Sequence, residues 1–557
     1  MAGAACIFNF FIMNGNNVLL IWPKTDKGYY DLNPLSHIFG QKGAFFPLPL
    51  LCVASALGDS WNYSIADENV RPVSDAEACQ TDFFLISCNV LQRNAVENLL
   101  ARLEPYRKPI IVGGPISATI PDAFSNRKIT KVIGEIEGVE QSTAETGTTV
   151  AELLSLHMKA GALRPQYRSR GFPDLRTIRP PRIDLLKSNR YFTFSMQTSR
   201  GCHNNCDFCQ ERFLYGTHRR KNTAQVMAEL DQLVVLGRQR CVFIIDDNFT
   251  GNVSIPERKR EISELLDAMY QWQRAHQFPF DFFSQCSIEI ADHDDLMELM
   301  ARAGLNLVFL GIETINSAAL KSVHKTQNVK ADILSAIDRI RGHGIGIMGG
   351  LIVGFDEDTA DSVDAVAKFV QQSSIPFTGI SLLFAPPGTR LYSRLYAQGR
   401  ISGDPDALTK SFRTNIIPKM HPAQLYGHYF RLAKTLYSAD AYFSRCLRWT
   451  DRWNDSHVLP GTKGSVPANL RINRIARSVF HQGFLSRYRF HYWIYVARLI
   501  VKFRRNRNKI AVAMYLGYFF SVIDSVVNHL EKFMVAIPEE IISEWEAFQK
   551  KSKANAQ

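Results

Sequence analysis

Short runs of apolar residues recur along the first part of the chain, separated by polar segments. The runs cover residues 17–23, 83–87, 109–115 and 131–135. Uniformly apolar runs of this length are typical of parallel strands that are buried on both faces. An amphipathic segment with helical spacing, residues 91–104, lies between two of them. This alternation predicts a doubly wound, Rossmann-like α/β sheet in residues 1–150.

Glycines stand near the ends of two of these predicted strands. Gly113 and Gly114 close the third run, and Gly134 lies in the fourth. Ligands of doubly wound sheets bind at the carboxyl ends of the strands, and a residue without Cβ lets a large ligand approach the backbone. We therefore predict that these three glycines contact a ligand. Taken alone, Gly-Gly-Pro is a weak signal, because turns use it often.

A second series of apolar runs begins at about residue 185. Each run ends in polar residues or glycine, which predicts a partial (β/α)6 barrel in residues 185–400 with its active site at the carboxyl ends of the strands. The mixed, basic and proline-containing segment 151–184 predicts a linker between the two domains. The six runs are 192–197, 241–249, 282–286, 307–314, 349–356 and 379–386.

Charge divides the chain unevenly. The whole sequence of 557 residues carries a net charge of +12, and residues 401–557 hold 24 Lys and Arg against 11 Asp and Glu. Within them, residues 463–509 contain twelve basic residues, no acidic residue and several aromatic ones, and an apolar run follows at 510–523. We predict that residues 401–557 form a basic, mainly helical region with an anionic partner.

Three interpretations of this basic region remain open. Basic helices with aromatic faces can lie in a membrane interface, and the apolar run is short for a membrane span. The region can equally be a soluble helical cap that packs on the barrel. Binding to nucleic acid is the third interpretation, and we do not expect it, because no recognised RNA-binding motif accompanies the charge.

The cysteines indicate a reducing environment. Seven of the ten are scattered without paired spacing, which argues against a disulfide framework and for the cytoplasm. The apolar start, residues 1–13, has no basic flank and is too short to span a membrane.

The other three cysteines form the most specific motif of the chain. Cys202, Cys206 and Cys209 have the spacing Cys-x3-Cys-x2-Cys on one short segment. Thiolates are soft ligands that favour iron–sulfur clusters. Three of them can hold three irons of a [4Fe–4S] cluster and leave the fourth iron open for a substrate-like ligand. Phe208, just before the third cysteine, would cover the edge of the cluster.

Two other interpretations of these cysteines were weighed. They can be buried apolar residues without a ligand, or they can hold a structural zinc ion together with His203 or a distant histidine. Zinc sites usually contain paired Cys-x2-Cys units, and only one such pair is present.

Polar residues at the ends of the barrel strands are candidates for the chemistry. Asp246 and Asp247, followed by Asn248, end the second run, where they can bind a ligand or cap the next helix, which is the commoner use of such residues. Glu313 ends an otherwise apolar strand, and a carboxylate there needs a partner. Arg200 stands next to the cysteine motif and can pair with a ligand carboxylate or form a structural ion pair.

The order of several short motifs narrows the function by resemblance. The cysteine motif resembles that of the radical S-adenosylmethionine (SAM) superfamily. Over roughly residues 17–450 the chain is similar to its cobalamin-dependent subgroup, which includes hopanoid C-2 methylase and the bacteriochlorophyll side-chain methyltransferases. The motifs are Leu214-Tyr215-Gly216, Asp246-Asp247-Asn248-Phe249-x-Gly251-Asn252, Gly311-Ile312-Glu313-Thr314, Lys325-x-Gln327-Asn328 and Ala385-Pro386-Pro387-Gly388-Thr389.

The resemblance implies a set of cofactors and their contacts. SAM would bind the open iron, and its adenine would lie over a strand that carries Gly350, Ile352, Gly354 and Glu357. Either Arg200 or Arg212, which flank the cysteine motif, could pair with the SAM carboxylate. Asp246, Asp247 and Glu313 would act in catalysis. Cobalamin would bind the first domain at Gly113, Gly114 and Gly134. No protein histidine is expected on cobalt, because the Asp-x-His-x-x-Gly motif is absent and His37 is the only histidine before residue 150.

The resemblance also implies a reaction. A 5′-deoxyadenosyl radical would take a hydrogen atom from the substrate, and methylcobalamin would deliver a methyl group to the unactivated carbon. The substrate would be a small or lipid-like molecule, such as an isoprenoid or a tetrapyrrole, and flavodoxin or ferredoxin would donate electrons. The enzyme would be cytoplasmic, on the inner face of the membrane if the basic region binds lipid. The alternatives are a cobalamin-dependent radical cyclisation or rearrangement and a zinc-containing nucleic-acid-binding protein.

Overall fold

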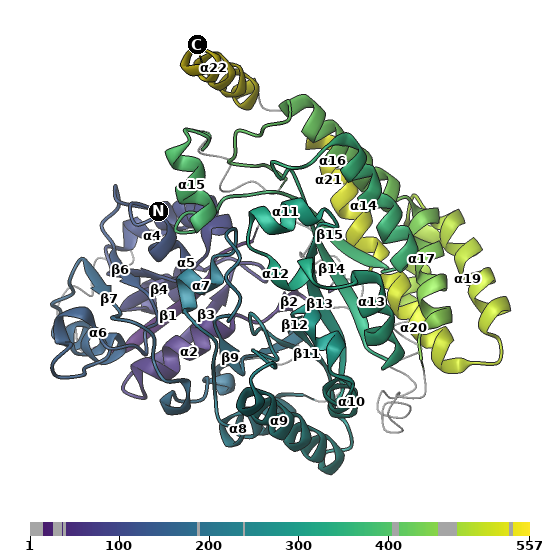
Figure 1. The fold of residues 1–557 in the computed structure, drawn as a ribbon. Helices are drawn as coiled ribbons and strands as arrows, with labels where there is room; N and C mark the ends of the chain where they lie inside the picture. The colour runs from purple at the N-terminus through teal and green to yellow at the C-terminus, as the bar shows by residue number, and fades with distance from the viewer. Residues whose placement is uncertain are drawn as a thin grey trace.

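A computed structural model describes residues 15–25, 36, 41–186, 190–237, 240–403, 412–454, 476–533 and 539–556. Two parallel sheets lie side by side, and helices from the last part of the chain cover the second sheet on the side away from the first (Figure 1). The predicted residues His37 and Lys463, and the apolar start 1–13, lie outside the described residues.

The first sheet has six parallel strands in the order β3-β1-β4-β5-β6-β7. Alternate residues of β1 enter two separate cores: Leu19 and Ile21 face α3 to α5, whereas Val18 and Leu20 face α2 and α6. Cover on both faces explains why the strands are uniformly apolar. The strands are β1 (Asn17–Trp22), β3 (Asn62–Asp67), β4 (Phe83–Ser87), β5 (Ile110–Gly113), β6 (Thr130–Ile133) and β7 (Gln166–Arg168), and the helices are α2 (Leu48–Leu57), α3 (Asp75–Gln80), α4 (Arg93–Leu103), α5 (Pro115–Thr119) and α6 (Val150–Lys159).

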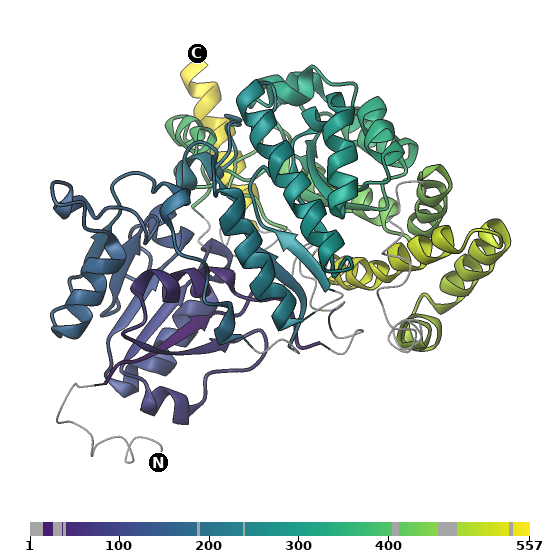
Figure 2. The ribbon, with the colours of Figure 1, turned by 90° about the horizontal axis from the view of Figure 1, so that it is seen from below.

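Among the described residues, the second sheet has seven parallel strands, and they follow one another across the sheet in chain order. Its edge strands do not pair with each other in the described part of the chain, so the barrel is open. The strands are β2 (Gly43–Phe45), β8 (Tyr191–Met196), β11 (Arg240–Ile244), β12 (Phe280–Cys286), β13 (Leu305–Glu313), β14 (Gly346–Val353) and β15 (Phe377–Leu382). The helices between them are α8 (Thr223–Leu236), α9 (Pro256–Ala275), α10 (Asp294–Ala303), α13 (Ile333–Gly342) and α14 (Ala360–Ser373). They cover the outer face of the curved sheet (Figure 2).

Short elements surround the carboxyl ends of the barrel strands. They are β9 (Ser199–Arg200), α7 (Glu211–Tyr215), β10 (Arg219–Arg220), α11 (Ser317–Ser322), α12 (Thr326–Val329) and α15 (Arg390–Ala397). Together they frame the three cysteines of the predicted cluster motif.

The two domains are more interleaved than the sequence pattern indicates. The first sheet runs to β7, so α6 and β7 lie in the segment expected to be a linker. In the other direction, β2 leaves the first domain and pairs with β8, joining Gly43 to Tyr191. Only three residues form each of these two strands, which is too few for a hydrophobic period to reveal them. Cys79 forms a disulfide bond. The sequence argued against a framework of several disulfides, and one bridge is compatible with that prediction.

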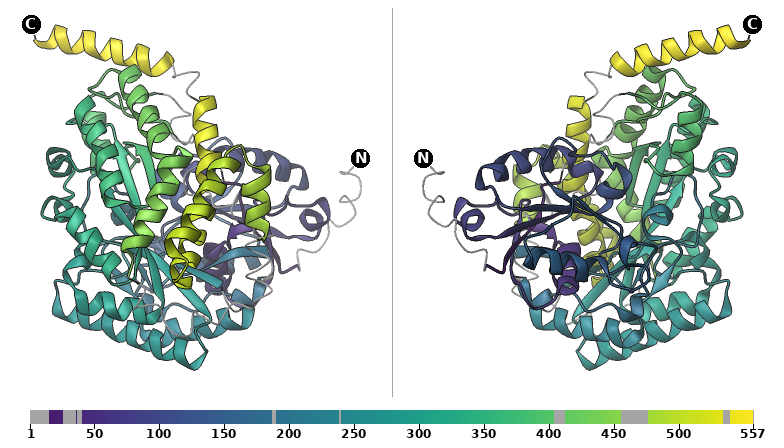
Figure 3. Two further views of the ribbon diagram at one scale, coloured as in Figure 1. Left: turned by 90° about the vertical axis from the view of Figure 1, so that its right-hand side faces the viewer. Right: turned by 90° about the vertical axis from the view of Figure 1, so that its left-hand side faces the viewer.

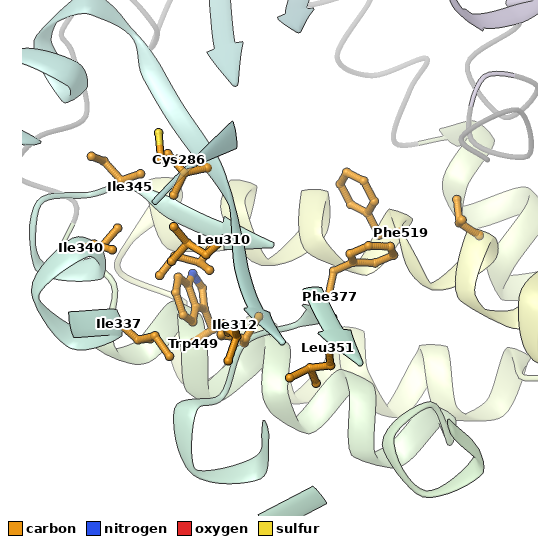
Figure 4. Close-up of a cluster of buried hydrophobic side chains, with 14 of the residues drawn as sticks. Cys286, Leu310, Ile312, Ile337, Ile340, Ile345, Leu351, Phe377, Trp449 and Phe519 are labelled. Atoms are coloured by element: carbon orange, nitrogen blue, oxygen red, sulfur yellow. The ribbon is translucent and has the colours of Figure 1, made fainter. Parts of the chain in front are cut away.

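The last part of the chain forms helices that pack on the barrel. Phe519, between two of them, lies against Phe377 of β15, and Trp449 of α17 enters the core behind the same sheet (Figure 4). The elements are α16 (Pro422–Leu436), α17 (Ala439–Arg452), the π-helical turn η9 (Val479–Leu485), α19 (Arg489–Phe503), α20 (Arg507–Tyr518), α21 (Phe520–Phe533) and α22 (Glu539–Ala556). Only α22 extends away from the body (Figure 3).

One segment among the described residues, Arg507–Asn528, is long and apolar enough to cross a membrane by length and composition. The sequence pattern indicated a run too short for this. Half of the segment is buried inside the structure, and Phe519 and Phe520 lie in the barrel-side core.

Candidate active site between the two sheets

The three cysteines lie on the loop between β9 and α7, at the carboxyl end of β8. The backbone N–H of Cys202 donates to Gly216 O at 3.3 Å, and that of Cys209 to Cys206 O at 3.2 Å. Gly201 has φ +80°, and a Cβ there would come within 2.7 Å of Gly216 O and Thr217 O. The loop therefore requires glycine immediately before its first cysteine.

Two carboxylates at the end of β11 hold this loop in place. Asp246 is fully buried and accepts hydrogen bonds from Thr198 N at 2.7 Å, Ser199 Oγ at 2.6 Å and the Thr198 hydroxyl. Asp247 accepts from Gly201 N at 2.7 Å. Their contacts in the structure are thus with the cysteine loop, and neither carboxylate caps the next helix.

The expectation that one of Asp246, Asp247 and Asn248 caps the next helix is wrong. The next helix, α9, begins at Pro256, and its N-cap residue Ile255 makes no side-chain cap. Asn248 instead donates to His203 in the cysteine loop at 3.4 Å and accepts from Thr250. Helix α9 starts eight residues after Asn248, so these polar residues are too far from it to act as its cap. They hold the loop around the site in place instead.

Asp247 also forms a buried acid pair with Glu211 of α7. Burial and the neighbouring Glu211 charge raise the pKa of Asp247 well above its usual range, and burial raises the pKa of Glu211. Both groups are therefore weaker acids than exposed carboxyl groups are.

The structure also bears on the zinc interpretation of the three cysteines. In the part of the chain that the structure describes, no three Cys, His, Asp or Glu side chains are arranged to hold one metal ion. A mononuclear zinc site needs such convergence, because each Zn–S bond is about 2.3 Å long. A [4Fe–4S] cluster takes each thiolate on a different iron. Burial raises the pKa of the Cys202 and Cys209 thiols, so ionising them requires a cation nearby.

A buried cation and an amide approach the loop from α12. Gln327 Nε2 lies 3.7 Å from Cys206 Sγ, and Lys325 Nζ lies 5.9 Å from the centre of the Phe208 ring. Lys325 forms a 2.9 Å ion pair with Glu313. Burial opposes the charge of Lys325, but the Glu313 carboxylate outweighs it and raises the pKa of Lys325 above its usual value.

Glu313 takes its position from an irregular strand end. The register of β13 against β14 shifts between Gly311 and Glu313, and Glu313 has φ +62°. A Cβ on Gly311 would lie 2.3 Å from Glu313 Oε1 and 3.0 Å from Lys325 Nζ. Glycine at 311 therefore makes room for the ion pair. The structure gives Glu313 the partner that a buried carboxylate needs.

The residues predicted to lie along SAM follow β14. Ile352 packs in one apolar cluster with Phe208 of the cysteine loop, so this strand end reaches the loop. A Cβ on Gly350 would come 2.8 Å from the Phe309 ring, and Gly354 has φ +105°. Glu357 accepts from Ser322 Oγ of α11 at 2.9 Å. Packing and backbone conformation account for both glycines in the ligand-free chain, and their contact with SAM stays a prediction.

A cavity of about 210 Å³ lies between the two sheets. Its wall includes residues at the carboxyl ends of strands of both sheets, such as Ser87, Gly113, Gln197 and Ile245, so the carboxyl ends of the two sheets meet there. The wall also includes all three predicted glycines. The apolar part of the lining includes Leu48, Leu50, Val53, Leu85, Ile111, Val132, Ile136, Leu154 and Leu214.

The three glycines of this cavity differ in what they require. A Cβ on Gly114 would come 2.6 Å from Cys88 O, and one on Gly134 would come 2.9 Å from Ser169 Cβ. Both have positive φ, so their conformations also favour glycine. A Cβ on Gly113 would meet only Val132, at 3.5 Å or more. Close contacts and positive φ thus explain Gly114 and Gly134, whereas a side chain at Gly113 would make only ordinary contacts with Val132.

A buried network of ion pairs beside the cavity joins the first domain to β9 and β10, which pair with each other as a small antiparallel sheet. Arg200 of β9 binds Glu135 at 2.5 Å and Glu137 at 3.0 Å, and Arg219 of β10 binds Glu135 from the other side. Burial would raise the pKa of Glu137, but the Arg200 guanidinium outweighs it and holds that pKa below the usual range. These contacts match the structural ion pair considered for Arg200, and its contact with SAM stays a prediction.

Sequence reasoning missed several residues of this site. Glu135 and Glu137 directly follow Gly134, at the carboxyl end of β6, which is the signal that could have indicated them. Glu211 carries no spacing signal, because its partner Asp247 is distant in the chain. Lys325 and Gln327 were noted only as part of a short motif.

Two protein-family models match the chain. The model of the radical SAM superfamily matches residues 196–370, which covers the cysteine loop and most of the barrel. A domain of unknown function, DUF4070, matches residues 389–532, which covers the C-terminal helices up to α21.

Curated relatives extend the similarity over both domains. An uncharacterized methyltransferase of Synechocystis is 32% identical over 480 residues, 85% of this chain and 86% of that protein. The hopanoid C-2 methylase of Rhodopseudomonas palustris is 29% identical over 393 residues, 70% and 71% of the two chains.

A solved structure shares the fold at low sequence identity. The cobalamin-dependent SAM radical enzyme OxsB, with aqua-cobalamin bound, is 13% identical, and the match covers 96% of this chain and 84% of that one with a TM-score of 0.57. The predicted order of an α/β sheet, a partial barrel and a helical region is therefore confirmed as a known architecture.

Proposed function

The chain belongs to the cobalamin-dependent radical SAM family, and we propose that it transfers a methyl group from SAM to an unactivated carbon of a small or lipid-like molecule. One observation carries the proposal. The cavity that the glycines of the first sheet line is also lined by Gln197, Arg200 and Tyr215, which flank the cysteine loop. A ligand bound to the first domain and a ligand bound to the barrel would therefore meet in this cavity.

The chemistry belongs to the cofactors and their placement to the chain. When bound, the cluster and SAM supply a carbon-centred radical that takes a hydrogen atom from the substrate, and cobalamin supplies the methyl group. Cys202, Cys206 and Cys209 would hold three irons. The loop that carries them is held by Asp246 and Asp247, so these carboxylates orient the cysteines.

The apolar cavity fits part of cobalamin. Its wall is mainly aliphatic, and Gly113 leaves room beside Val132. An apolar, aromatic portion of a large ligand binds well in such a cavity. Gly113, Gly114 and Gly134 would contact it, and no histidine lines the cavity among the described residues. That no protein histidine binds cobalt stays a prediction.

SAM would lie between the cysteine loop and β14. Gly350 and Ile352 lie in that strand and Gly354 and Glu357 follow it, and Ile352 packs against the same apolar cluster as Phe208 of the loop. Glu313 is held by Lys325 and faces the same loop, where a carboxylate can accept from a hydroxyl or amino group of SAM.

The partners follow from the reaction. We expect an apolar substrate of the isoprenoid or tetrapyrrole kind, because hopanoids are what the Rhodopseudomonas relative methylates by its name. An electron donor such as flavodoxin or ferredoxin would reduce the cluster. We expect the enzyme in the cytoplasm and in peripheral contact with the inner membrane, where such a substrate is available.

Label transfer tests the proposal. The cofactor-loaded full chain is incubated anaerobically with SAM that carries a deuterated methyl group, together with bacterial lipid and pigment extracts. The expected result is a product that retains the labelled methyl group, and the triple Cys202→Ala, Cys206→Ala, Cys209→Ala variant gives none. A new product without the label would show cyclisation or rearrangement and would contradict methyl transfer.

A further inference from the structure

Helix α19 has two apolar faces, and only one of them is used inside the molecule. Tyr492, Tyr495, Leu499 and Phe503 are buried. Tyr495 stacks on Phe443 of α17 at a centroid distance of 4.6 Å and donates its hydroxyl hydrogen to Ala513 O of α20. This face fixes α19 to α17 and α20.

The opposite face of α19 is also apolar, and it is exposed. Phe490, Ile494, Ala497 and Val501 follow one another at spacings of four, three and four residues, which places them on one stripe of a helix. Phe490, Ile494 and Val501 are 68%, 49% and 74% exposed. Because α19 lies at the outer edge of the molecule, no other described element covers this stripe (Figure 1).

Other exposed apolar side chains lie close to this stripe in the sequence. Eight of the seventeen exposed large hydrophobic side chains among the described residues lie between residues 480 and 501. Clustering of this kind marks an interaction site, whereas scattered exposed hydrophobic residues need no explanation. We call these eight the α19 surface: Phe480, Phe484, Leu485, Phe490, Trp493, Ile494, Ile500 and Val501.

Positive charge surrounds the α19 surface. Residues 476–523 contain no Asp or Glu. Arg489 and Arg498 lie on α19 itself, Arg504, Arg505 and Arg507 follow it, and all five are exposed. None of the five has a carboxylate partner among the described residues. Two copies of this surface would repel each other, so its charge disfavours self-association and favours an anionic partner.

The apolar run 510–523, which follows α19, does not belong to this exposed surface. Phe519, Phe520, Val522 and Ile523 are buried in the barrel-side core. A Cβ on Gly517 would come 2.9 Å from Tyr495 Cε1, so α20 packs closely on α19. The exposed apolar area of this region therefore lies on η9 and α19.

We infer that the α19 surface docks on an anionic lipid bilayer, with its apolar side chains at the boundary of headgroups and acyl chains and its arginines against the headgroups. Apolar area bounded by basic residues is the composition that binds such an interface. The inference rests on the proposed function in one respect: the enzyme would meet a lipid-like substrate at the bilayer. It narrows the predicted membrane contact from the basic segment 463–509 to η9 and α19.

Vesicle co-sedimentation of the cluster-loaded full chain tests the inference. The vesicles are phosphatidylcholine alone or phosphatidylcholine with phosphatidylglycerol, at low and raised salt. We expect binding only with phosphatidylglycerol, and weaker binding at raised salt because salt screens the arginines. Replacing one arginine by glutamine should weaken binding about fivefold.

A pair of double variants separates the surface from general effects. Ile494→Asp with Val501→Asp puts two charges on the stripe and should abolish binding. Leu156→Asp with Val235→Asp changes two residues that are 61% and 87% exposed elsewhere, and should bind as the wild type does. Iron content and circular dichroism check that both variants fold.

Four results would overturn the inference: equal binding of both double variants, no binding of the wild type, binding that survives raised salt and needs detergent for release, or a dimer that the stripe variant dissociates without any vesicle binding. Label transfer to substrate is measured separately, so a failure here leaves methyl transfer standing.

Discussion

Asp246 and Asp247 hold the cysteine loop in place. Their substitution should therefore affect protein stability and cluster binding. Asp246 and Asp247 bind donors on residues 198–201, just ahead of the first cysteine. Their side chains were predicted from sequence because they follow an apolar strand. Their roles could not be predicted, because the donors that they meet are 46 to 48 residues away in the chain.

We expect Asp246→Ala to destabilise the protein by about 3 kcal/mol, because three buried donors lose their acceptor. The thermal unfolding midpoint and the iron content after anaerobic reconstitution should both fall. Asp295→Ala removes an exposed carboxylate that pairs with Lys259 and serves as the control, with an expected effect below about 1 kcal/mol. Unfolding and iron loading of Asp246→Ala at the wild-type level would contradict this role.

Gln327 should tune the cluster through Cys206. Its amide donates toward Cys206 Sγ, and hydrogen bonds to cluster sulfurs stabilise the reduced, more negative form. Gln327→Leu should therefore lower the reduction potential, measured by electron paramagnetic resonance during titration. Asn306→Leu, at the amino end of β13, should leave the potential unchanged. An unchanged potential in Gln327→Leu would exclude the hydrogen bond as a determinant.

His218 should make the stability sensitive to mild acid. Burial, followed by the charge of Arg220, lowers the pKa of His218 from 6.5 to about 3. The unfolded chain therefore takes up a proton below pH 6.5 that the folded chain rejects. The stability from this residue is complete above that pH and falls by up to about 1.4 kcal/mol per pH unit below it.

His218→Gln removes this titration. Between about pH 7 and about pH 5, the unfolding midpoint of the variant should decline less steeply than that of the wild type. Parallel declines would show that His218 is protonated in the folded protein.

At the scale of elements, the strand predictions succeeded where a strand is apolar on both faces. All six predicted barrel strands and the four predicted strands of the first sheet are present. β3 was missed, because it pairs only with β1 at the edge of the sheet and alternates polar with apolar residues. β2 and β7 are too short for a period, and their pairing is decided by contacts distant in the chain.

The ion pair between Glu137, which follows β6, and Arg200 of β9 should couple the first domain energetically to the segment that carries the cysteine loop. Arg200 and Glu137 are both largely buried, so removing one leaves an unpaired charge and costs about 3–5 kcal/mol. Arg200→Met alone should be strongly destabilising, whereas Arg200→Met with Glu137→Met should recover part of the loss.

Denaturant unfolding of the four chains of this cycle measures the coupling, which should be about 1–3 kcal/mol. The pair Lys259 and Asp295, on the surface, serves as the comparison and should couple by less than about 1 kcal/mol. Additive effects at Arg200 and Glu137 would mean that the ion pair does not couple the first domain to this segment.

At the scale of the whole molecule, the arrangement explains why one chain carries two domains of this kind. The carboxyl ends of both sheets border one cavity, and β2 ties the first domain into the edge of the barrel. The C-terminal helices close the far side and present the α19 surface (Figure 2). The sequence indicated the architecture through a resemblance, but the crossing of β2 and the exposed stripe of α19 depend on packing.

Elemental analysis of the anaerobically purified full chain, expressed with a supply of cobalamin, tests the central claim most directly. The account predicts about four irons and about one cobalt per chain, and in the triple cysteine variant the iron is lost while the cobalt stays. Stoichiometric zinc in place of iron, or iron without cobalt in the folded protein, would contradict it.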